Sequence, residues 1–350
     1  MENNNKSKLT LIIDGNWLLM SRLSVMNSKY VPINELTRDL KLLMARSISI
    51  MLKQFPKIDN IILVADGGSW RCDLDVPKFL EKDNITYKGN REQDPELDWD
   101  SIFGAYTEFQ ELMAKSGITV CREFGVEGDD WCWNLSRRLN KQGTNVIIWS
   151  MDKDLTQLVQ TDKDGCFTVT WNKLYMTKQI KPESEMDFLF NFNYSINEGI
   201  LGSIERKAKE VREINPIDIV IDKIIRGDAG DNILPIILKE GKTKQFKVSQ
   251  KDIDLTIDIL NETQIDDYLL NLLSQKSYKD KVKKPYQDIF EHFKYNQKLV
   301  MLHESSYPQE ILDIMDGIEL GSASTNISYM EEKLNALKTS GNKIDLFEEI

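Results

Sequence analysis

Histidine and cysteine are scarce in this sequence, and their scarcity restricts the chemistry that the chain can support. The 350 residues contain two histidines, His292 and His303, and four scattered cysteines that form no C-x-x-C pair. Zinc sites are usually built from closely spaced residues of these two types. A zinc site is therefore disfavoured, and no histidine or cysteine chemistry is required.

Long apolar segments are also missing. No run approaches the roughly 20 apolar residues that cross a bilayer, and the first residues, MENNNKSK, do not resemble a secretory signal. With the four scattered cysteines, these features predict a cytoplasmic protein in a reducing compartment, without a membrane partner. A chain of this length with 41% hydrophobic residues can bury a sizeable core.

What the sequence does have is aspartate where apolar segments end. The runs KLTLIID, NIILVAD and NVIIWSMDKD have the length of buried strands, and they deliver Asp14, Asp66, and the pair Asp152 and Asp154. Open α/β sheets bind ligands in the crevice beyond the carboxyl ends of their strands. The pattern predicts three parallel strands whose carboxylates meet at one edge.

Two further acidic groups lie on predicted helices and turns. The segment VEGDDWCWNLSRRLNKQ has a helical pattern whose first turn carries Glu127, Asp129 and Asp130. Acids in a first turn also stabilise the helix dipole, so this group has a purely structural interpretation as well. The segment IIRGDAGDNI places Asp228 and Asp231 in a glycine-containing turn between helical stretches.

This many carboxylates can stay ionised close together only if cations neutralise them. Oxygen ligands select hard divalent ions, above all Mg²⁺, for which Mn²⁺ can substitute. Two such ions about 3.5–4 Å apart stabilise both the attacking and the leaving oxygen of a phosphoryl displacement. The acidic residues therefore predict two bound divalent ions and hydrolysis of a phosphodiester.

The order of the acidic motifs resembles a known family. The series IDG, ADG, EGDD, SMDKD and GDAGDN, with YKGNR between the second and third, is similar to the flap-endonuclease and 5′-3′ exonuclease superfamily. Further stretches, GGSWRCD and FKYNQKLVML among them, most resemble the ribonuclease H (5′ nuclease) branch of T-even-type bacteriophages. The resemblance extends over roughly residues 9–310.

The resemblance implies a structure-specific 5′ nuclease, with 5′-3′ exonuclease, flap endonuclease and ribonuclease H activities. Such an enzyme removes RNA primers and adjacent DNA during replication, leaving a 5′-phosphate and a 3′-hydroxyl. Its substrates are DNA and RNA–DNA hybrid duplexes with 5′ ends, flaps or forks. The sliding clamp and the single-strand-binding protein are implied as partners of a monomer, and a phage-encoded member would work in the host cytoplasm.

By resemblance, the nine acids form the metal site, and Asp66 and Asp152 are counted as catalytic. One ion is held mainly by Asp66, Asp129 and Asp152, with Asp14 close by. The second ion is held, often through water, by Asp154 and Asp228, and Glu127, Asp130 and Asp231 lie in a wider shell.

The basic motif YKGNR resembles the residues at the base of the family's helical arch. A cation beside the scissile phosphate stabilises the negative charge that develops there, so Lys88 and Arg91 are predicted to be catalytic. Outside the family context, the pair has the simpler interpretation of a solvated loop. Tyr87 of the same motif and Arg71 of SWRCD are predicted to contact DNA, with Arg71 holding a phosphate or a neighbouring acid.

The net charge of −11 is unusual for a protein that binds DNA, but nine negative charges belong to the predicted metal site. Bound cations reverse the sign of such a site. Lysines that follow the last acids can form a phosphate track, which sets affinity without reading sequence, or can simply be a solvated surface. These lysines are Lys239, Lys242, Lys244 and Lys247.

The chain is predicted to have two domains and two tails. Residues 1–8 are polar and predicted to be disordered. Residues 9–180 alternate strand and helix patterns and predict an α/β nuclease domain, a central mainly parallel sheet flanked by helices in a PIN-like 5′ nuclease fold. Its irregular segment at about 73–100 is predicted to be the arch. Residues 181–335 predict a helical DNA-binding region that carries the last acidic pair.

Two later segments have their own interpretations. ERKAKEVR, at 205–212, has the composition of a polar helix in an insertion without a clear role. The tail 336–350 ends in IDLFEEI, which resembles the short peptides that dock on sliding clamps but lacks their opening glutamine. The simpler interpretation of this tail is a helix end packed on the body.

Two departures from the family pattern have consequences. After GDAGDN the chain reads ILPIILKEGK, without most of the hairpin glycines that hold a monovalent cation in many members, so such a site is not expected. Gly128 stands where alanine is usual. Glycine is a poorer helix former by about 1 kcal/mol in a helix interior, and by less near a helix start.

Three other classes of protein compete with this interpretation. PIN-type ribonucleases share strand-end acids, but they are short and lack YKGNR and the helical extension. A haloacid-dehalogenase-type phosphatase needs a DxT or DxV motif, which IIDGNW does not supply. A non-catalytic subunit that binds replication forks and clamps would be expected to have lost some of the acids.

Overall fold

The structure is a computed structural model. It describes residues 8–26, 31–55, 58–80, 86–171, 173–177, 192–237, 248–279, 282 and 284–320. The N-terminal residues before Lys8, the tail at 336–350 and part of the predicted arch, 81–85, lie outside the described residues.

The chain divides into two compact units. Unit 1 comprises residues 1–68, 93–214 and 313–350, and unit 2 comprises residues 69–92 and 215–312. This division differs from the predicted domain boundary near residue 180, because residues 192–214 pack with unit 1 and the segment before Gln93 packs with unit 2.

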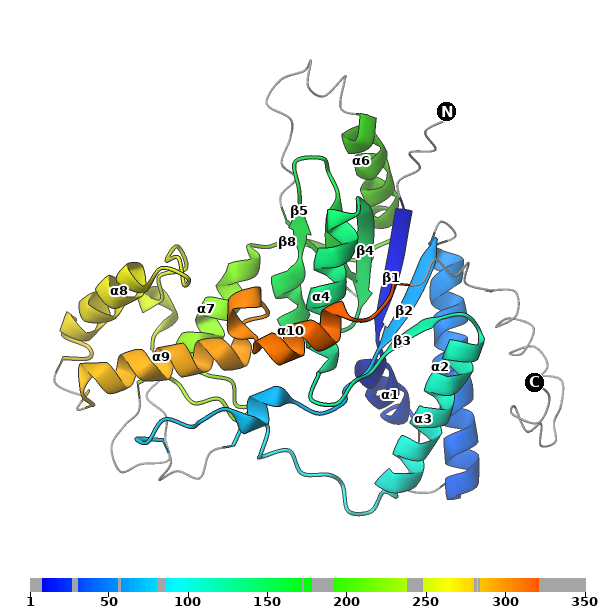
Figure 1. The fold of residues 1–350 in the computed structure, drawn as a ribbon, viewed down its shortest axis with the longest axis horizontal. Helices are drawn as coiled ribbons and strands as arrows, with labels where there is room; N and C mark the ends of the chain where they lie inside the picture. The colour runs from blue at the N-terminus through cyan, green and yellow to red at the C-terminus, as the bar shows by residue number, and fades with distance from the viewer. Residues whose placement is uncertain are drawn as a thin grey trace. The chain divides into compact units, whose positions relative to one another are not determined.

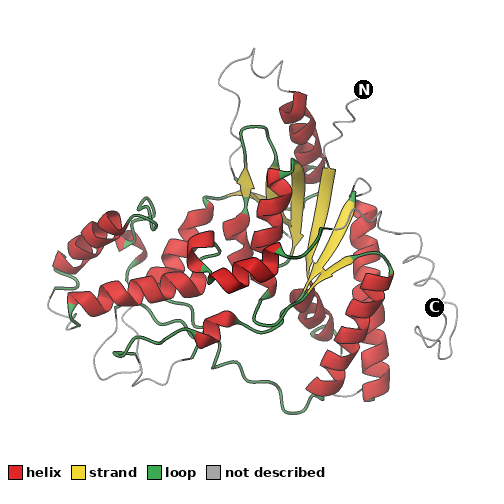
Figure 2. Cartoon of the chain, viewed as in Figure 1, coloured by secondary structure: helices red, strands yellow, loops and turns green. Residues whose placement is uncertain are grey.

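Unit 1 is built on a sheet of eight described strands in the order β3-β2-β1-β4-β6-β7-β8, with β5 paired to β6 (Figures 1 and 2). The neighbours from β3 to β6 are parallel, and β6 pairs antiparallel with β5 and with β7. The predicted mainly parallel sheet is thus confirmed. The strands are β1 (Lys8–Asp14), β2 (Asn60–Val64), β3 (Thr119–Cys121), β4 (Thr144–Trp149), β5 (Gln160–Thr161), β6 (Phe167–Trp171), β7 (Leu174–Met176) and β8 (Val211–Glu213).

Helices flank this sheet. On one side, Leu11 and Ile13 of β1 share a buried cluster with residues of α1, α2, α3 and α6. α4 contacts β1, β2, β4 and β6, and its buried Trp131 and Leu135 are not part of that cluster. Since successive strand residues point to opposite faces, both faces of the sheet are covered. The helices of unit 1 are α1 (Gly15–Leu23), α2 (Ile33–Gln54), α3 (Trp99–Lys115), α4 (Gly128–Lys141), η4 (Asp154–Leu158) and α6 (Phe192–Glu205).

Unit 2 is helical in its described part, apart from irregular loops. Proline opens two of its helices: Pro216 is the first residue of α7, and Pro285 directly precedes α9. Ile224, Leu269 and Phe293 are fully buried in its apolar core. The elements are η2 (Trp70–Asp73), α7 (Pro216–Arg226), η5 (Gln250–Asp252), α8 (Glu262–Ser274), α9 (Tyr286–Val300) and η6 (Glu304–Ser306), and α10 (Gln309–Asp316) leads back to unit 1.

The predicted polar helix at 205–212 is wrong. α6 ends at Glu205, and Val211–Glu213 forms β8, which pairs in parallel with β7. A strand of three exposed residues has no buried face, so its sequence carries no alternation of apolar and polar residues that could reveal it. Among the described helices, none is long and apolar enough to cross a membrane.

Candidate metal centre

Asp14 is fixed where β1 passes into α1. It is the last residue of the strand and the N-cap of the helix, and its carboxylate accepts a hydrogen bond from the backbone N–H of Trp17 at 2.9 Å. The next residue must be glycine, because a Cβ at Gly15 would lie 2.2 Å from the hydroxyl oxygen of Tyr106 and 2.7 Å from the carbonyl oxygen of Val64. The Asp-Gly pair thus sets both the position and the packing of this carboxylate.

Ser150 connects the acids of two neighbouring strands. Its hydroxyl donates to the carboxylate of Asp14 at 2.7 Å and accepts from the N–H of Asp152 at 3.0 Å. The carboxylate of Asp152 in turn accepts from the N–H of Asp154 at 2.9 Å, where η4 begins. The acids that follow β1 and β4 are therefore held in one hydrogen-bonded chain.

Asp66 lies two residues beyond β2. Its carboxylate accepts the N–H of Gly128, the first residue of α4, at 2.6 Å. Its own N–H donates to the side chain of Asn16 at 3.3 Å. A Cβ at Gly128 would lie 3.1 Å from the carboxylate oxygen of Asp66, so the glycine that departs from the family's alanine permits this close approach.

The first turn of α4 carries three predicted ligands with different roles. The carboxylate of Asp130 is fully buried and accepts the N–H of Glu127 at 3.1 Å, in a capping box. Glu127 is also buried, whereas Asp129 is partly exposed. The capping box gives the carboxylate of Asp130 a structural role in this turn, and the part that each of these acids takes in metal binding stays a prediction.

The electrostatics indicate that these acids share one region. Burial raises the pKa of Asp14 to about 6; the hydrogen bonds from Trp17 and Ser150 lower it, and the charges of Asp66 and Asp152 raise it further. Burial is thus the main reason why the charged form of Asp14 is disfavoured, and repulsion from Asp66 and Asp152 adds to it. An all-oxygen donor set of this kind fits a hard divalent cation, which would remove the repulsion.

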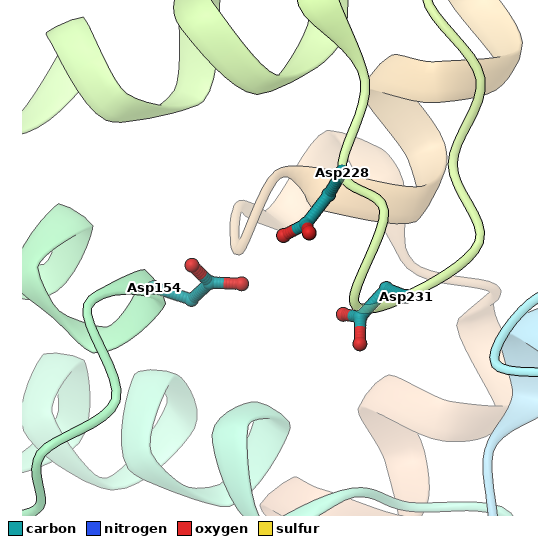
Figure 3. Close-up of side chains that lie close together, drawn as sticks. All are labelled: Asp154, Asp228 and Asp231. Atoms are coloured by element: carbon teal, nitrogen blue, oxygen red, sulfur yellow. The ribbon is translucent and has the colours of Figure 1, made fainter. Parts of the chain in front are cut away.

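Asp228 and Asp231 belong to unit 2, on the turn that follows α7 (Figure 3). The turn closes on itself, because the backbone N–H and C=O of Asp228 bond those of Ile233 at 2.9 and 2.7 Å. Lys223 forms an ion pair with Asp228. Burial disfavours the charge of Asp228, but Lys223 and the N–H groups of the turn outweigh burial and hold its pKa below the usual range.

The predicted catalytic cations lie beside this turn in unit 2. The backbone N–H of Lys88 donates to the carbonyl oxygen of Asp231 at 2.9 Å, and Arg91 forms an ion pair with the carboxylate of Asp231. The amine of Lys88 lies 5.0 Å from the ring centroid of Tyr87. The basic motif and the last acidic motif are therefore neighbours, although 140 residues separate Arg91 from Asp231.

Two residues that are predicted to contact DNA have buried side chains. Arg71 is 2% exposed, and its guanidinium lies 4.6 Å from the ring centroid of Trp70 and 5.7 Å from that of Tyr307. Tyr87 is 9% exposed and packs in the core of unit 2. Both side chains have a structural role in this unit. The lysines of the predicted phosphate track, Lys239, Lys242, Lys244 and Lys247, lie outside the described residues.

Three residues that the structure places beside the acids were not predicted from the sequence. These are Ser150, Lys223 and Asn16, whose side-chain oxygen accepts from both Asp66 and the hydroxyl of Tyr106. The serine two residues before Asp152 carries a local signal, because serine often bonds the N–H two residues later. Lys223 and Asn16 act on partners that folding brings to them, and the sequence alone offers no sign of this.

The comparison with protein families gives the class of this domain, which is resolvase-like. Residues 10–187 match the family model described as the 5′-3′ exonuclease N-terminal resolvase-like domain. This match covers half of the chain, and the chain therefore belongs to the 5′-3′ exonuclease family.

Relatives and solved structures agree with this assignment. The chain is 30% identical to a 5′-3′ exonuclease of Buchnera aphidicola over 152 residues, 42% of this chain and 49% of that protein. It is 24% identical to a 5′-3′ exonuclease of Mycoplasma pneumoniae over 171 residues, 49% of each. The chain thus spans about half the length of these curated relatives.

The solved structures share the fold. The T5 D15 protein co-crystallised with metal ions has a TM-score of 0.51 at 18% identity, covering 94% of this chain and 99% of that one. The T5 5′-exonuclease with bound zinc ions has a TM-score of 0.52 at 17% identity, covering 93% and 99%. The resemblance to the T-even branch stays a prediction.

Proposed function

We propose that this protein is a divalent-metal-dependent, structure-specific 5′ nuclease. The observation that carries the proposal is the group of Asp14, Asp66 and Asp152, which lies at the carboxyl ends of three adjacent parallel strands in a member of the 5′-3′ exonuclease family. Its three proposed activities are 5′-3′ exonuclease and flap endonuclease action on DNA, and ribonuclease H action on RNA–DNA hybrids.

The proposed ligands of two Mg²⁺ ions are the nine acids. Asp66, Asp129, Asp152 and Asp14 would hold one ion, and Asp154 and Asp228 would hold the other, with Glu127, Asp130 and Asp231 around them. When bound, the ions supply an activated water and stabilise negative charge on the phosphate. Mn²⁺ would replace Mg²⁺, because both are hard ions that prefer oxygen ligands.

The chain's own residues contribute binding and orientation. Lys88 and Arg91 would meet the scissile phosphate, where their positive charge is most stabilising as negative charge develops. Ser150 would orient the carboxylate of Asp14 through the hydrogen bond at 2.7 Å, and would hold the backbone of Asp152 through the bond at 3.0 Å. Arg71 would support the site from inside unit 2, because its side chain is buried.

The proposed role is the removal of RNA primers and adjacent DNA during replication, by a monomer in the cytoplasm. Membership of the 5′-3′ exonuclease family supports DNA as the substrate. The sliding clamp and the single-strand-binding protein are proposed partners, with the tail at 336–350 as the clamp-docking segment.

A non-catalytic fork- and clamp-binding subunit is the alternative from another class, and a PIN-type ribonuclease is the alternative from the same chemistry. A subunit that only binds forks would have no need of acids at the ends of three strands, nor of the serine hydroxyl that bonds the carboxylate of Asp14 and the backbone N–H of Asp152. A PIN-type ribonuclease would cut single-stranded RNA without requiring a 5′ end or a flap.

The test is cleavage of matched 5′-labelled substrates with Mg²⁺ or EDTA: a DNA flap, a nicked duplex, an RNA–DNA hybrid, and single-stranded DNA and RNA. We expect Mg²⁺-dependent products from flaps, nicks and hybrids, and none from Asp152→Asn, which should still bind the flap. Binding without cleavage by the wild-type protein would support the replisome subunit. Cleavage restricted to single-stranded RNA would support the PIN-type ribonuclease.

A further inference from the structure

The loop at 86–91 and the turn at 228–233, both in unit 2, are joined by side-chain amides as well as by the backbone. The amide nitrogen of Asn232 donates to the carbonyl oxygen of Thr86 at 2.9 Å. The amide nitrogen of Asn90 donates to the carbonyl oxygen of Ala229 at 2.7 Å. Each segment thus contributes one asparagine that bonds the backbone of the other.

The joined segments contain an energetically unfavourable backbone. Among the described residues, Lys88 and Asn232 are the non-glycine residues with positive φ, at 56° and 58°. Asparagine tolerates this left-handed region, whereas lysine rarely adopts it. A lysine stays in such a conformation only if its surroundings hold it there. The bonds to the turn, including the one from the N–H of Lys88 to Asp231 at 2.9 Å, provide that constraint.

A small cavity lies beside Asn232. Tyr87, Asn232, His292 and Asn296 are among the residues that line it, and its volume is about 10 Å³. That is room for about one water molecule. The hydrogen bond from Asn232 to Thr86 is therefore a direct restraint on the loop beside a site where packing is not complete.

We propose that Asn232 and Asn90 are positioning residues, whose amides hold the Lys88 loop against the Asp228–Asp231 turn. The amine of Lys88, which is proposed to contact the scissile phosphate, then stays at a fixed distance from the acids that are proposed to hold the second metal ion. The proposal rests on the proposed function, since it assigns these asparagines a role in the same reaction. The asparagines act through Lys88 and do not touch the reacting atoms.

The test compares Asn232→Gly with the matched control Asn261→Gly. Glycine keeps the positive φ at position 232 and removes only the amide. Asn261 lies in the same unit and caps α8, where its side chain accepts from Thr263 and Gln264, so its replacement also removes side-chain hydrogen bonds. With a 5′-labelled DNA flap and Mg²⁺, we expect kcat to fall between about 10- and 100-fold in Asn232→Gly with KM unchanged, and neither to change in the control.

A double-mutant cycle separates positioning from general damage. In a Lys88→Ala background, Asn232→Gly should have no further effect on kcat, because the amine that it positions is already gone. If Asn232→Gly lowered kcat by the same factor in the wild-type protein and in the Lys88→Ala variant, the proposal would be overturned. Asn90 is exposed, so Asn90→Ala tests the same prediction with little risk to folding. A wild-type protein that cuts no substrate would contradict the proposed function, an outcome distinct from failure of the cycle.

Discussion

Single side chains at the carboxyl ends of the strands decide how the acids are held. Ser150 lets one hydroxyl serve both Asp14 and Asp152, by donating to one and accepting from the other. Hydrogen bonds to a charged acceptor are roughly twice as strong as neutral ones, so the carboxylate of Asp14 has a well-defined orientation. The orientation of this acid is thus set by the protein's own hydrogen bonds.

Replacing Asp66 by asparagine tests the role of its charge. The amide oxygen can still accept the N–H of Gly128, so the fold should survive while the affinity for Mg²⁺ is lost. We expect cleavage of a DNA flap to fall by at least about 1,000-fold, in line with the several kcal/mol that metal ions contribute.

The control for this variant is Asp59→Asn, just before the amino end of the same strand. Asp59 accepts the N–H of Leu9 at 2.9 Å, and an asparagine oxygen can do the same. Its cleavage rate should equal that of the wild-type protein. Equal rates for Asp66→Asn and Asp59→Asn would contradict a role for Asp66 in metal binding.

The lowered pKa of the buried side chain of His292 predicts how the stability of the folded protein depends on pH. Burial, helped by the charge of Lys284, lowers its pKa to about 3 in the folded protein, against 6.5 for an unperturbed histidine. The unfolded chain therefore binds the proton more readily, and stability is lost as pH falls below about 6.5. The slope is at most about 1.4 kcal/mol per pH unit, and there is no contribution above that pH.

Urea unfolding at pH 7.5, 6.5 and 5 measures this effect. Between pH 6.5 and pH 5, the free energy of unfolding of the wild-type protein should fall by about 2 kcal/mol more than that of the His292→Phe variant. Phenylalanine keeps a ring beside Phe79, whose centroid lies 5.8 Å from the imidazole. His303→Gln, at an exposed histidine, should retain the wild-type dependence. Parallel curves for the wild type and His292→Phe would contradict the assignment.

At the scale of elements, the turn after α7 depends on Gly227. Its φ of +70° is unfavourable for other residues, and a Cβ there would lie 2.3 Å from the carbonyl oxygen of Ile233. The closed turn from Asp228 to Ile233 leaves no room for even one methyl group. The conformation of the last acidic motif is therefore set by the residue before it.

Gly227→Ala and Gly143→Ala form a matched pair that separates two costs. Gly143 has a similar φ of +72°, but a Cβ there meets no described atom within 4 Å. Gly143→Ala should destabilise the fold by about 1–2 kcal/mol, the cost of the left-handed backbone. Gly227→Ala should cost more and also weaken Mg²⁺ binding. Urea unfolding measures the loss of stability, and Mg²⁺ titration measures the loss of affinity. Equal effects of the two variants would contradict the prediction, because they would show that the close contact at residue 227 is relieved at little cost in free energy.

The sequence predicted the elements whose signals are local. Apolar runs ending in aspartate correctly located β1, β2 and β4, and the acidic first turn of α4 was visible in its helical periodicity. Charge and aromaticity do not reveal burial, so the sequence did not show that the side chains of Arg71 and Tyr87 are buried; their contacts with DNA stay predictions. The hydrogen bond from Asn232 to Thr86 spans 146 residues, and no local pattern contains that information.

At the scale of the whole molecule, the chain passes between its two units several times. Unit 1 is assembled from three stretches and unit 2 from two, with residues 69–92 separated from 215–312 by most of unit 1. Neither unit is a continuous piece of sequence. Folding of each unit therefore requires distant parts of the chain.

This connectivity predicts that a fragment ending at residue 180 does not fold cooperatively. The cut removes α6 and β8 from unit 1 and all of 215–312 from unit 2, which exposes the residues that pack against them. A chain ending at residue 320 keeps every described element and should unfold at the wild-type temperature. Thermal unfolding followed by circular dichroism decides, and a sharp transition in the 1–180 fragment would refute the expectation.

The sheet's outermost strands have a consequence for behaviour at high concentration. β3 and β8 have only three residues each, and the ion pairs of Glu210 with Lys173 and Arg212 put charge along the second edge. Short, charged borders offer a poor template for adding a strand from another molecule. The edges of the described sheet thus disfavour the joining of copies into fibrils through their sheets at high concentration.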